Sequence, residues 1–454
     1  MKLVPSSLVA LATLALAQPL LADMPATPFQ SDGKADPGYM VPDELSLNYA
    51  LSFALDNNFA IRQAKERIRQ QEGIVLEVRA QQIPNVISSA GYSGYAQQIS
   101  STGDDRSWSI NITARQVLFA GGGISAAVKA QRLTLDAAVL QLQSVIDAAL
   151  LDVRTRFYNV LVTRERIKVQ EQNVELLRRQ LQDVKNRFEA GTVSNFEVLR
   201  AEVAVANAQP ALISARNNFR LAIDDLRQSL GFVTTDAANI ARTPEFSGKL
   251  EFTPVSYELA SALATAKERR PDLQRLKKLE EVAEQIVTVR RSNYYPDLSL
   301  YAAYDWRKRP GYSDFAASRD GVTVGVQSSW DIFDGRATRG RVVQAESALE
   351  QARLALSEAE LSVSVDVRRS LSSLQEATEL AEASKKVVEQ AEEAVRLADA
   401  RYAAGTATQL DVLTARNDLT TARLNQLQAF YSFNVASANV RRAMGLPDEL
   451  VAGR

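Results

Sequence analysis

Two similar stretches decide the fold of this chain: "RFEAGTVSNFEVLRAE" at residues 187–202 and "RYAAGTATQLDVLTAR" at residues 401–416. Each interrupts a long helical pattern with a glycine, and Gly405 lies 214 positions after Gly191. A glycine at such a break ends one helix, and a Ser, Thr or Asn just after it can cap the next. The candidate caps are Ser194 or Asn195 and Thr406 or Thr408. Each stretch therefore predicts a reversal between two antiparallel helices.

The two halves of the chain share further landmarks in the same order. Pro84 aligns with Pro296, "VLFAGGG" at 117–123 with "DIFDGRA" at 331–337, and Gly231 with Gly445, at offsets of 212 to 214. We therefore predict a duplicated unit rather than a short-period solenoid. The predicted boundaries are a first repeat at 23–231, an equatorial linker at 232–255, a second repeat at 256–445 and a C-terminal tail at 446–454.

The period of the pattern changes from helical to alternating in the middle of each repeat. A helix at about 46–80 opens the first repeat. Apolar and polar residues then alternate at 107–119 in the first repeat and at 298–306 and 322–333 in the second, and 86–98 forms a weaker segment. Such alternation predicts half-exposed strands, two in each repeat. The three tryptophans all fall in these segments: Trp108, Trp306 and Trp330.

A very long helix is predicted after each pair of strands. Residues 125–187 and 341–404 contain neither Gly nor Pro, and a helix of that length would run roughly 95 Å. Apolar residues recur every seven positions along both: Val139, Ile146, Val153, Val160, Ile167, Val174, Leu181 and Phe188, then Val367, Leu374, Ala381, Val388, Val395 and Tyr402. Sustained heptads predict helices that pack lengthwise as coiled coils.

Composition excludes several classes of function. The formal net charge is −1, which gives no electrostatic basis for nucleic-acid binding. The chain has no His and no Cys, which excludes Ser-His-Asp catalysis, His- or Cys-based zinc sites and a lipid-modified cysteine. We expect no enzyme activity, no cofactor and no metal site. The "AGGG" of residues 120–123 lacks the lysine of a phosphate-binding loop.

The N-terminal residues resemble an export signal. Lys2 precedes an apolar run at 8–16, and "LLA" at 20–22 suits cleavage after Ala22, with Ala17 as the alternative. The predicted signal peptide is therefore 1–22. We expect no later segment to be apolar enough for a transmembrane helix.

The predicted strands suit a membrane but cannot close a barrel alone. A strand of roughly 9–11 residues crosses a bilayer, and one apolar face with one polar face is typical of a barrel wall. Membrane barrels start at about eight strands, because open edges are not tolerated in lipid. Either several chains share a barrel, or the strands form a soluble sheet, which would give the same alternation.

The chain resembles the TolC-like outer-membrane efflux proteins over essentially its whole mature length. The duplicated layout, the motifs "LFAGGG" and "IFDGRA", and the two stretches quoted first carry the resemblance. It implies a mainly α fold with membrane β structure, in which a homotrimer forms a twelve-stranded β-barrel continued by an α-helical barrel. It also implies a passive exit channel in the outer membrane, with most of the chain in the periplasm. The implied partners are a periplasmic adaptor, an inner-membrane transporter of the RND or ABC class and outer-membrane lipid.

The resemblance also assigns roles to residues. The hairpin tips, with Gly191, Thr192, Gly405 and Thr406, would dock the adaptor. Glu197, Tyr402 and Asp411 would line the periplasmic constriction, and Gly121, Gly122 and Gly335 would form the strand–helix junctions. The three tryptophans would be membrane-interface aromatics. Some members of the family place an Arg two residues after the second tip glycine, where this chain has Ala407, so the closing contact is not predicted.

Glu197 and Asp411 suit a solvent-exposed helix face equally well, so the alternative for both is a residue of such a face with no role in a constriction. A periplasmic coiled-coil adaptor is the alternative function. Adaptors usually pair one helical hairpin with compact β domains, whereas two hairpins and four strands are predicted here. The exported substrate and the class of transporter are not readable from the sequence.

Overall fold

Long helices account for most of the described chain. The computed structural model describes residues 43–94, 106–232, 242–309, 312, 317–448 and 450. The predicted signal peptide, residues 233–241 of the predicted linker, and parts of the predicted strand turns and C-terminal tail lie outside these residues. Apart from Arg242 and Thr243, all the described residues belong to one compact unit.

The two repeats contain the same elements in the same order. The first contains α2 (Leu47–Asn57), α3 (Phe59–Arg79), β2 (Asn85–Gly94), β3 (Arg106–Ala120), α4 (Gly123–Glu189) and α5 (Asn195–Leu230). The second contains α7 (Leu259–Arg269), α8 (Pro271–Arg291), β5 (Asp297–Lys308), β6 (Ser318–Ser329), α9 (Ala337–Ala403) and α10 (Gln409–Ala443). Single turns of 3-10 helix, η1 (Ala80–Gln82) and η2 (Ser292–Tyr294), precede β2 and β5. The predicted mainly α fold with two strands in each repeat is confirmed.

The prediction of one helix at 46–80 is wrong, because the chain breaks at Asn58. This residue is extended, and its Oδ1 accepts hydrogen bonds from the amides of Ala60 and Ile61, which caps α3. Its Nδ2 donates to the carbonyl oxygen of Ser229, at 2.7 Å. The second repeat breaks at Arg270, which is extended because Pro271 follows it.

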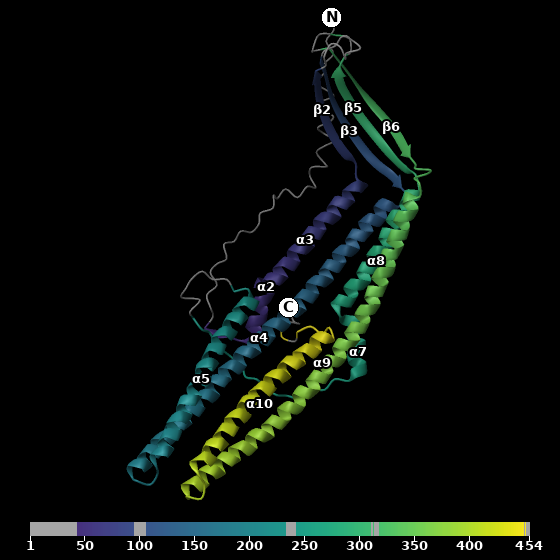
Figure 1. Cartoon of the computed structure of the whole chain (residues 1–454). Coiled ribbons are helices and arrows are strands. Elements are labelled where there is room, and N and C mark those ends of the chain that lie inside the picture. The colour runs from purple at the N-terminus through teal and green to yellow at the C-terminus, as the bar shows by residue number, and fades with distance from the viewer. Residues whose placement is uncertain are drawn as a thin grey trace. The chain divides into compact units, whose positions relative to one another are not determined.

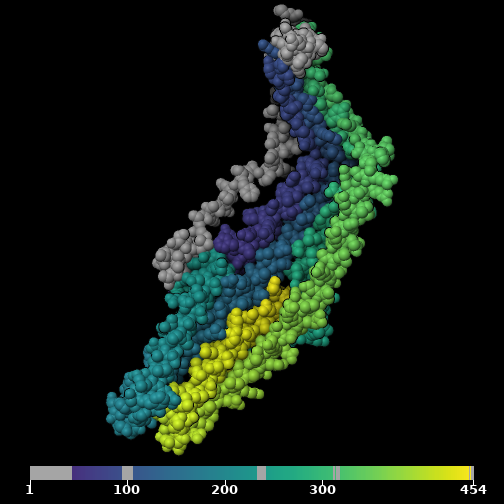
Figure 2. All heavy atoms as spheres, viewed as in Figure 1, coloured from purple at the N-terminus to yellow at the C-terminus, as the bar shows by residue number. Residues whose placement is uncertain are grey.

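Two helical hairpins, α4–α5 and α9–α10, form the long part of the fold. Figure 2 shows them side by side, and α10 also packs along α4. The heptad residues Val153, Val160, Val174, Val367 and Leu374 are buried, as a coiled coil requires. Val139 and Phe188, near the two ends of α4, are exposed.

Each repeat has its own apolar core near the bases of its hairpin. The first core joins α2, α4 and α5 through residues such as Leu51, Phe157 and Leu226. Phe246 also enters it, from the short strand β4 (Glu245–Phe246), which pairs in parallel with β1 (Glu44–Leu45). The second core joins α7, α8, α9 and α10. The described part of the linker therefore packs against the repeats.

One window of α4 is apolar enough, by length and composition, to cross a membrane, contrary to the expectation from sequence. Its mean hydropathy is 1.3, and 22% of it is buried. Length and composition are weak evidence for a span. The same helix packs lengthwise on α5, α8 and α3, which accounts for part of its apolar content.

The four strands form one antiparallel sheet in the order β2–β3–β5–β6 (Figure 1). The centre of the sheet, β3–β5, joins the two repeats. A β-bulge interrupts this pairing, since Val117 pairs with Ser299 and Phe119 with Leu298. Leu118 is therefore the extra residue, and the simple alternation predicted for 107–119 is wrong beyond Val117.

Candidate functional site

One face of the sheet is apolar across all four strands. The pairings place Ile112 beside Tyr304, and Tyr304 beside Val322, so that even-numbered residues share one face. Its members include Val86, Tyr92, Trp108, Ile110, Ile112, Leu298, Leu300, Trp306, Val322, Val324 and Val326. On the outer strand the three valines are 61–71% exposed. An apolar face that the described part of the chain leaves uncovered needs lipid or another protein to cover it.

The opposite face of the sheet is mostly polar. Asn111 Nδ2 donates to Asp305 Oδ1 at 2.7 Å, and Thr113 Oγ1 donates to Asn111 Oδ1 at 2.6 Å. Because lipid cannot satisfy such groups, this face suits a water-filled lumen. The unpaired backbone groups along the two outer strands of the sheet also need partners. Among the described residues, β2 and β6 each pair on one side only, and an open edge is not tolerated within a bilayer.

The three tryptophans lie at two levels of the sheet. Trp108 and Trp306 form an edge-to-face pair, with ring centroids 5.0 Å apart. Trp330 Nε1 donates to the carbonyl oxygen of Tyr294, at the end of the sheet next to η2. Trp306 lies nine positions after Asp297, the residue level with the end of β6. That spacing is about 31 Å along the strand, or roughly 23 Å of membrane thickness at the usual tilt.

The prediction that all three tryptophans lie within strands is wrong for Trp330. β6 ends at Ser329, where its pairing with Asp297 ends, and Trp330 is the next residue. Ile332 and Phe333, predicted in the same strand, also lie beyond it. Among the described residues of a single chain nothing pairs with this segment, so it does not form a strand.

The strand–helix junctions use left-handed backbone conformations. Gly121, Gly122 and Gly335 all have positive φ, at 56°, 78° and 65°. Arg336 occupies the position of Gly122 in the second repeat and is the one non-glycine residue of the described chain with positive φ, at 70°. A side chain at Gly121 would also collide with the backbone of Ser292, because a Cβ added to Gly121 would lie 2.6 Å from the carbonyl oxygen of Ser292.

Both hairpin tips close with the same hydrogen-bonded turn. The amide of Gly191 donates to Phe188 O and that of Thr192 to Arg187 O, both at 2.9 Å. At the second tip, Gly405 donates to Tyr402 O and Thr406 to Arg401 O. This is the Schellman motif, which needs a left-handed residue at the glycine. The φ values of Gly191 and Gly405 are 71° and 74°.

The two acidic residues near the tips differ in their contacts. Thr408 caps α10, and Asp411 Oδ2 accepts from the Thr408 amide at 2.7 Å, which completes a capping box. The pKa of Asp411 is held below its ordinary value, first by the hydrogen bond from the Thr408 backbone amide and second by the one from the Thr408 hydroxyl. Ser194 begins α5 without a side-chain cap bond, and Glu197 Oε2 is buried without a hydrogen-bond partner. The sequence pattern alone does not predict this difference, because Ser-x-x-Glu is the usual capping-box pattern, yet the box forms at Thr408 and Asp411 and not at Ser194 and Glu197.

Tyr402 contacts the other hairpin. The Arg187 guanidinium lies over its ring, 4.8 Å from the centroid. One to two turns away, Arg416 of α10 donates to Asp399 Oδ1 at 3.0 Å and to Gln180 Oε1 of α4 at 2.9 Å. The structure therefore joins the two tips through arginines. Neither Arg187 nor Arg416 was singled out from the sequence.

The tip residues Gly191, Thr192, Gly405 and Thr406 are all exposed. Apolar side chains around them are also exposed, namely Phe196, Leu199 and Leu410. An exposed apolar rim next to two free turns suits contact with another protein.

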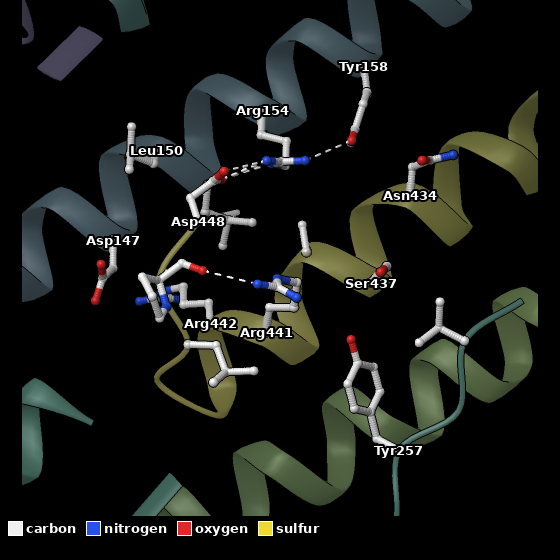
Figure 3. A pocket seen from close by; sticks show the side chains of 15 residues that line it. Asp147, Leu150, Arg154, Tyr158, Tyr257, Asn434, Ser437, Arg441, Arg442 and Asp448 are labelled. Carbon is white, nitrogen blue, oxygen red and sulfur yellow. Dashed lines mark hydrogen bonds and ion pairs between the residues drawn. The ribbon is translucent and has the colours of Figure 1, made fainter. Parts of the chain in front are cut away.

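A cavity of ≈ 220 Å³ lies between α4, α10 and the segment after α10 (Figure 3). At its wall Arg154 forms a largely buried bidentate ion pair with Asp448, at 2.6 and 3.1 Å, and Arg154 also donates to Tyr158. Burial lowers the pKa of Arg154, but Tyr158 and Asp448 outweigh burial and raise it above its ordinary value. This pair links the tail segment that follows α10 to α4 of the first repeat.

Comparison with known proteins agrees with this geometry. The model of the family described as outer membrane efflux protein matches residues 50–232 and 262–446. Protein CyaE of Bordetella pertussis is 28% identical over 408 residues, covering 88% of this chain and 85% of CyaE. Cobalt-zinc-cadmium resistance protein CzcC of Cupriavidus metallidurans is 27% identical over 409 residues, covering 88% of this chain and 90% of CzcC.

A solved structure shows the same fold. The Campylobacter jejuni CmeC outer membrane channel superposes with a TM-score of 0.77 at 16% identity, covering 88% of this chain and 85% of that one. The family model covers well over half of the chain, in two segments that each contain a strand pair and a helical hairpin. The chain belongs to the outer membrane efflux protein family.

Proposed function

We propose that three copies of this chain form a passive exit channel through the outer membrane. Three four-stranded sheets would join edge to edge into a twelve-stranded barrel, with the apolar face towards lipid and the polar face towards the lumen. The long helical hairpins would continue the channel into the periplasm. The single observation that carries the proposal is the sheet with two open edges and one uncovered apolar face.

The helices support the same assembly. Exposed apolar residues follow one stripe of α5, including Phe196, Leu199, Val203, Ile213 and Leu221. A second exposed set follows α9, including Leu354, Leu361, Leu380 and Val387. Such stripes need a partner helix, and neighbouring copies of the chain would supply one.

The periplasmic end would be the regulated mouth of the channel. Arg187 on Tyr402 and Arg416 on Gln180 hold the two hairpins of one chain together, which supports a closed state. These contacts would take the place of an arginine at Ala407. Glu197 and Asp411 would line the same constriction, with Asp411 also fixing the first turn of α10.

The partners of the channel would meet it at this end. A periplasmic adaptor would dock on the exposed tips at Gly191, Thr192, Gly405 and Thr406, next to the apolar rim of Phe196, Leu199 and Leu410. The adaptor would connect the channel to an inner-membrane transporter of the RND or ABC class. The channel itself would catalyse no reaction and carry no lipid anchor, and residues 1–22 would direct its export.

The experiment is fractionation followed by conductance measurement. The protein is expressed with its N-terminal residues in a Gram-negative host, and inner and outer membranes are separated. We expect it in the outer membrane as a detergent-soluble trimer that forms ion-conducting pores in planar bilayers. A soluble periplasmic monomer would contradict the channel and favour the adaptor alternative.

A further inference from the structure

The cavity between α4 and α10 lies where four parts of the chain meet. Its walls come from α4 of the first repeat, α10 of the second repeat, the segment that leads into α7 and the tail after α10 (Figure 3). The channel function proposed above gives this space no role. Its volume of ≈ 220 Å³ exceeds the about 10–15 Å³ that one water molecule needs, so the cavity has room for a small molecule.

The wall of the cavity carries more hydrogen-bond donors than acceptors. The lining side chains that can donate are Arg154, Tyr158, Tyr257, Asn434, Ser437, Arg441 and Arg442. The two lining carboxylates, Asp147 and Asp448, accept hydrogen bonds when ionised. Three arginines against two carboxylates leave one positive charge among the described lining residues. A wall of this kind favours a ligand that is anionic and accepts hydrogen bonds.

Part of this donor capacity is used within the chain. Arg154 donates to both oxygens of Asp448, so the wall already holds one carboxylate of the protein itself. Asn434 Nδ2 donates to Glu251 O at 2.9 Å and to Phe430 O at 2.8 Å. The first contact shows that this wall recognises a carboxylate, and the second leaves the Asn434 amide committed elsewhere.

Two hydroxyl groups of the wall have no hydrogen-bond partner in the described part of the chain. They belong to Tyr257, in the segment that leads into α7, and to Ser437 of α10, and both residues are half-buried. Figure 3 shows both hydroxyls pointing into the space between these two elements, with the Arg441 guanidinium beside them. Arg441 also donates to Pro447 O at 3.2 Å, which holds it on this side of the cavity. Three donor groups therefore converge on one part of the cavity.

We propose that this cavity binds a small oxyanion, a carboxylate or a phosphate group, through the hydroxyls of Tyr257 and Ser437 and the guanidinium of Arg441. The bound oxyanion would accept hydrogen bonds from α10 and from the segment that leads into α7, and so would join the two. A ligand that binds only the folded chain stabilises it more as the ligand concentration rises above its Kd. The site does not depend on the number of chains in the assembly.

Isothermal titration calorimetry of the full chain, purified in mild detergent, tests the site. Sodium phosphate and sodium acetate are titrated separately at constant ionic strength. We expect saturable binding of at least one of them, at one anion per chain, and the anion that binds shows which of the two groups the cavity takes. The same anion should raise the midpoint of thermal unfolding.

Tyr257→Phe combined with Ser437→Ala removes both hydroxyls but keeps the ring that packs on the second apolar core. This variant should bind the anion about tenfold more weakly, because each hydroxyl supplies a hydrogen bond to a charged group. Tyr49→Phe combined with Ser52→Ala removes the same two groups from α2, outside the cavity. This control should bind the anion as the unchanged protein does. Ser437→Ala alone, which alters only one side chain of α10, replaces the double variant if that variant does not fold.

Two results would overturn the proposal. If neither anion gives saturable binding to the unchanged protein, the cavity holds only water. If the cavity variant folds and binds the anion as tightly as the unchanged protein, the anion site lies elsewhere. Because the stoichiometry is counted per chain, neither result bears on the proposed channel.

Discussion

Backbone conformation at single residues limits which substitutions the tips can accept. Gly191 and Gly405 have positive φ, and a Cβ at either would meet nothing within 4 Å. Glycine is therefore required by the backbone and not by lack of space. Gly231 and Gly445 end α5 and α10 with the same motif but also with close contacts, since a Cβ on Gly231 would lie 2.3 Å from Asn57 O.

Gly405→Ala should loosen the second tip. A non-glycine residue in the left-handed region costs about 1–2 kcal/mol, partly offset by the lower entropy of the unfolded chain. We expect roughly fivefold faster hydrogen exchange of the Thr406 amide. The control is Gly340→Ala, within α9, which also has open space but no positive φ. Equal effects of the two changes would contradict the conformational explanation.

Asp411→Ala should fray the first turn of α10 by removing the capping box. Because the pKa of Asp411 is held below its ordinary value of 3.8, its contribution is complete above pH 3.8 and is lost as the pH falls below that value. Hydrogen exchange of residues 409–412 should therefore speed up in the variant at pH 7, and in the unchanged protein at low pH. Glu197→Ala is the matched control, since α5 has no such cap. A similar loss in both variants would show that the capping box is not the cause.

At the scale of elements, the sequence predicted the hairpins, the strands and the junction glycines because each has a strong local signal. Glycine breaks and heptads mark the helices, and alternation marks the strands. It missed the bulge at Leu118 and the end of β6 at Ser329, because both are set by which strand lies alongside. It also missed the break at Asn58, although Asn is a strong helix cap. The Arg187–Tyr402 contact joins elements over 200 residues apart and has no local signal.

Asp448→Asn should weaken the link between the repeats. Arg154 and Asp448 have side chains only 16% and 12% exposed, and removing one partner of such a pair costs roughly 3 kcal/mol. We expect the midpoint of thermal unfolding, measured by circular dichroism, to be lower in the variant. Glu393→Gln breaks the exposed pair with Arg396 and should leave the midpoint unchanged. Equal midpoints for both variants would show that the buried pair does not fasten the repeats.

Arg187→Ala should favour the open mouth. The change removes the cation–π contact with Tyr402, worth about 0.5–2 kcal/mol, so the mean single-channel conductance in planar bilayers should rise. Arg179→Ala is the control, because Arg179 pairs along its own helix, with Glu175. Unchanged conductance in the Arg187 variant would place the closing contact elsewhere.

At the scale of the whole molecule, one chain is an incomplete structure. Its sheet has an uncovered apolar face and two open edges, and its helices carry exposed apolar stripes. Each deficit would be met by the same operation, the addition of further copies around one axis.

Native mass spectrometry of protein extracted from the outer membrane in mild detergent tests this account most directly. The account predicts a single species of three chains, with no stable monomer, because four strands cannot satisfy their edges in lipid. A stable monomer in detergent, or a ring of any other number of chains, would contradict the twelve-stranded channel.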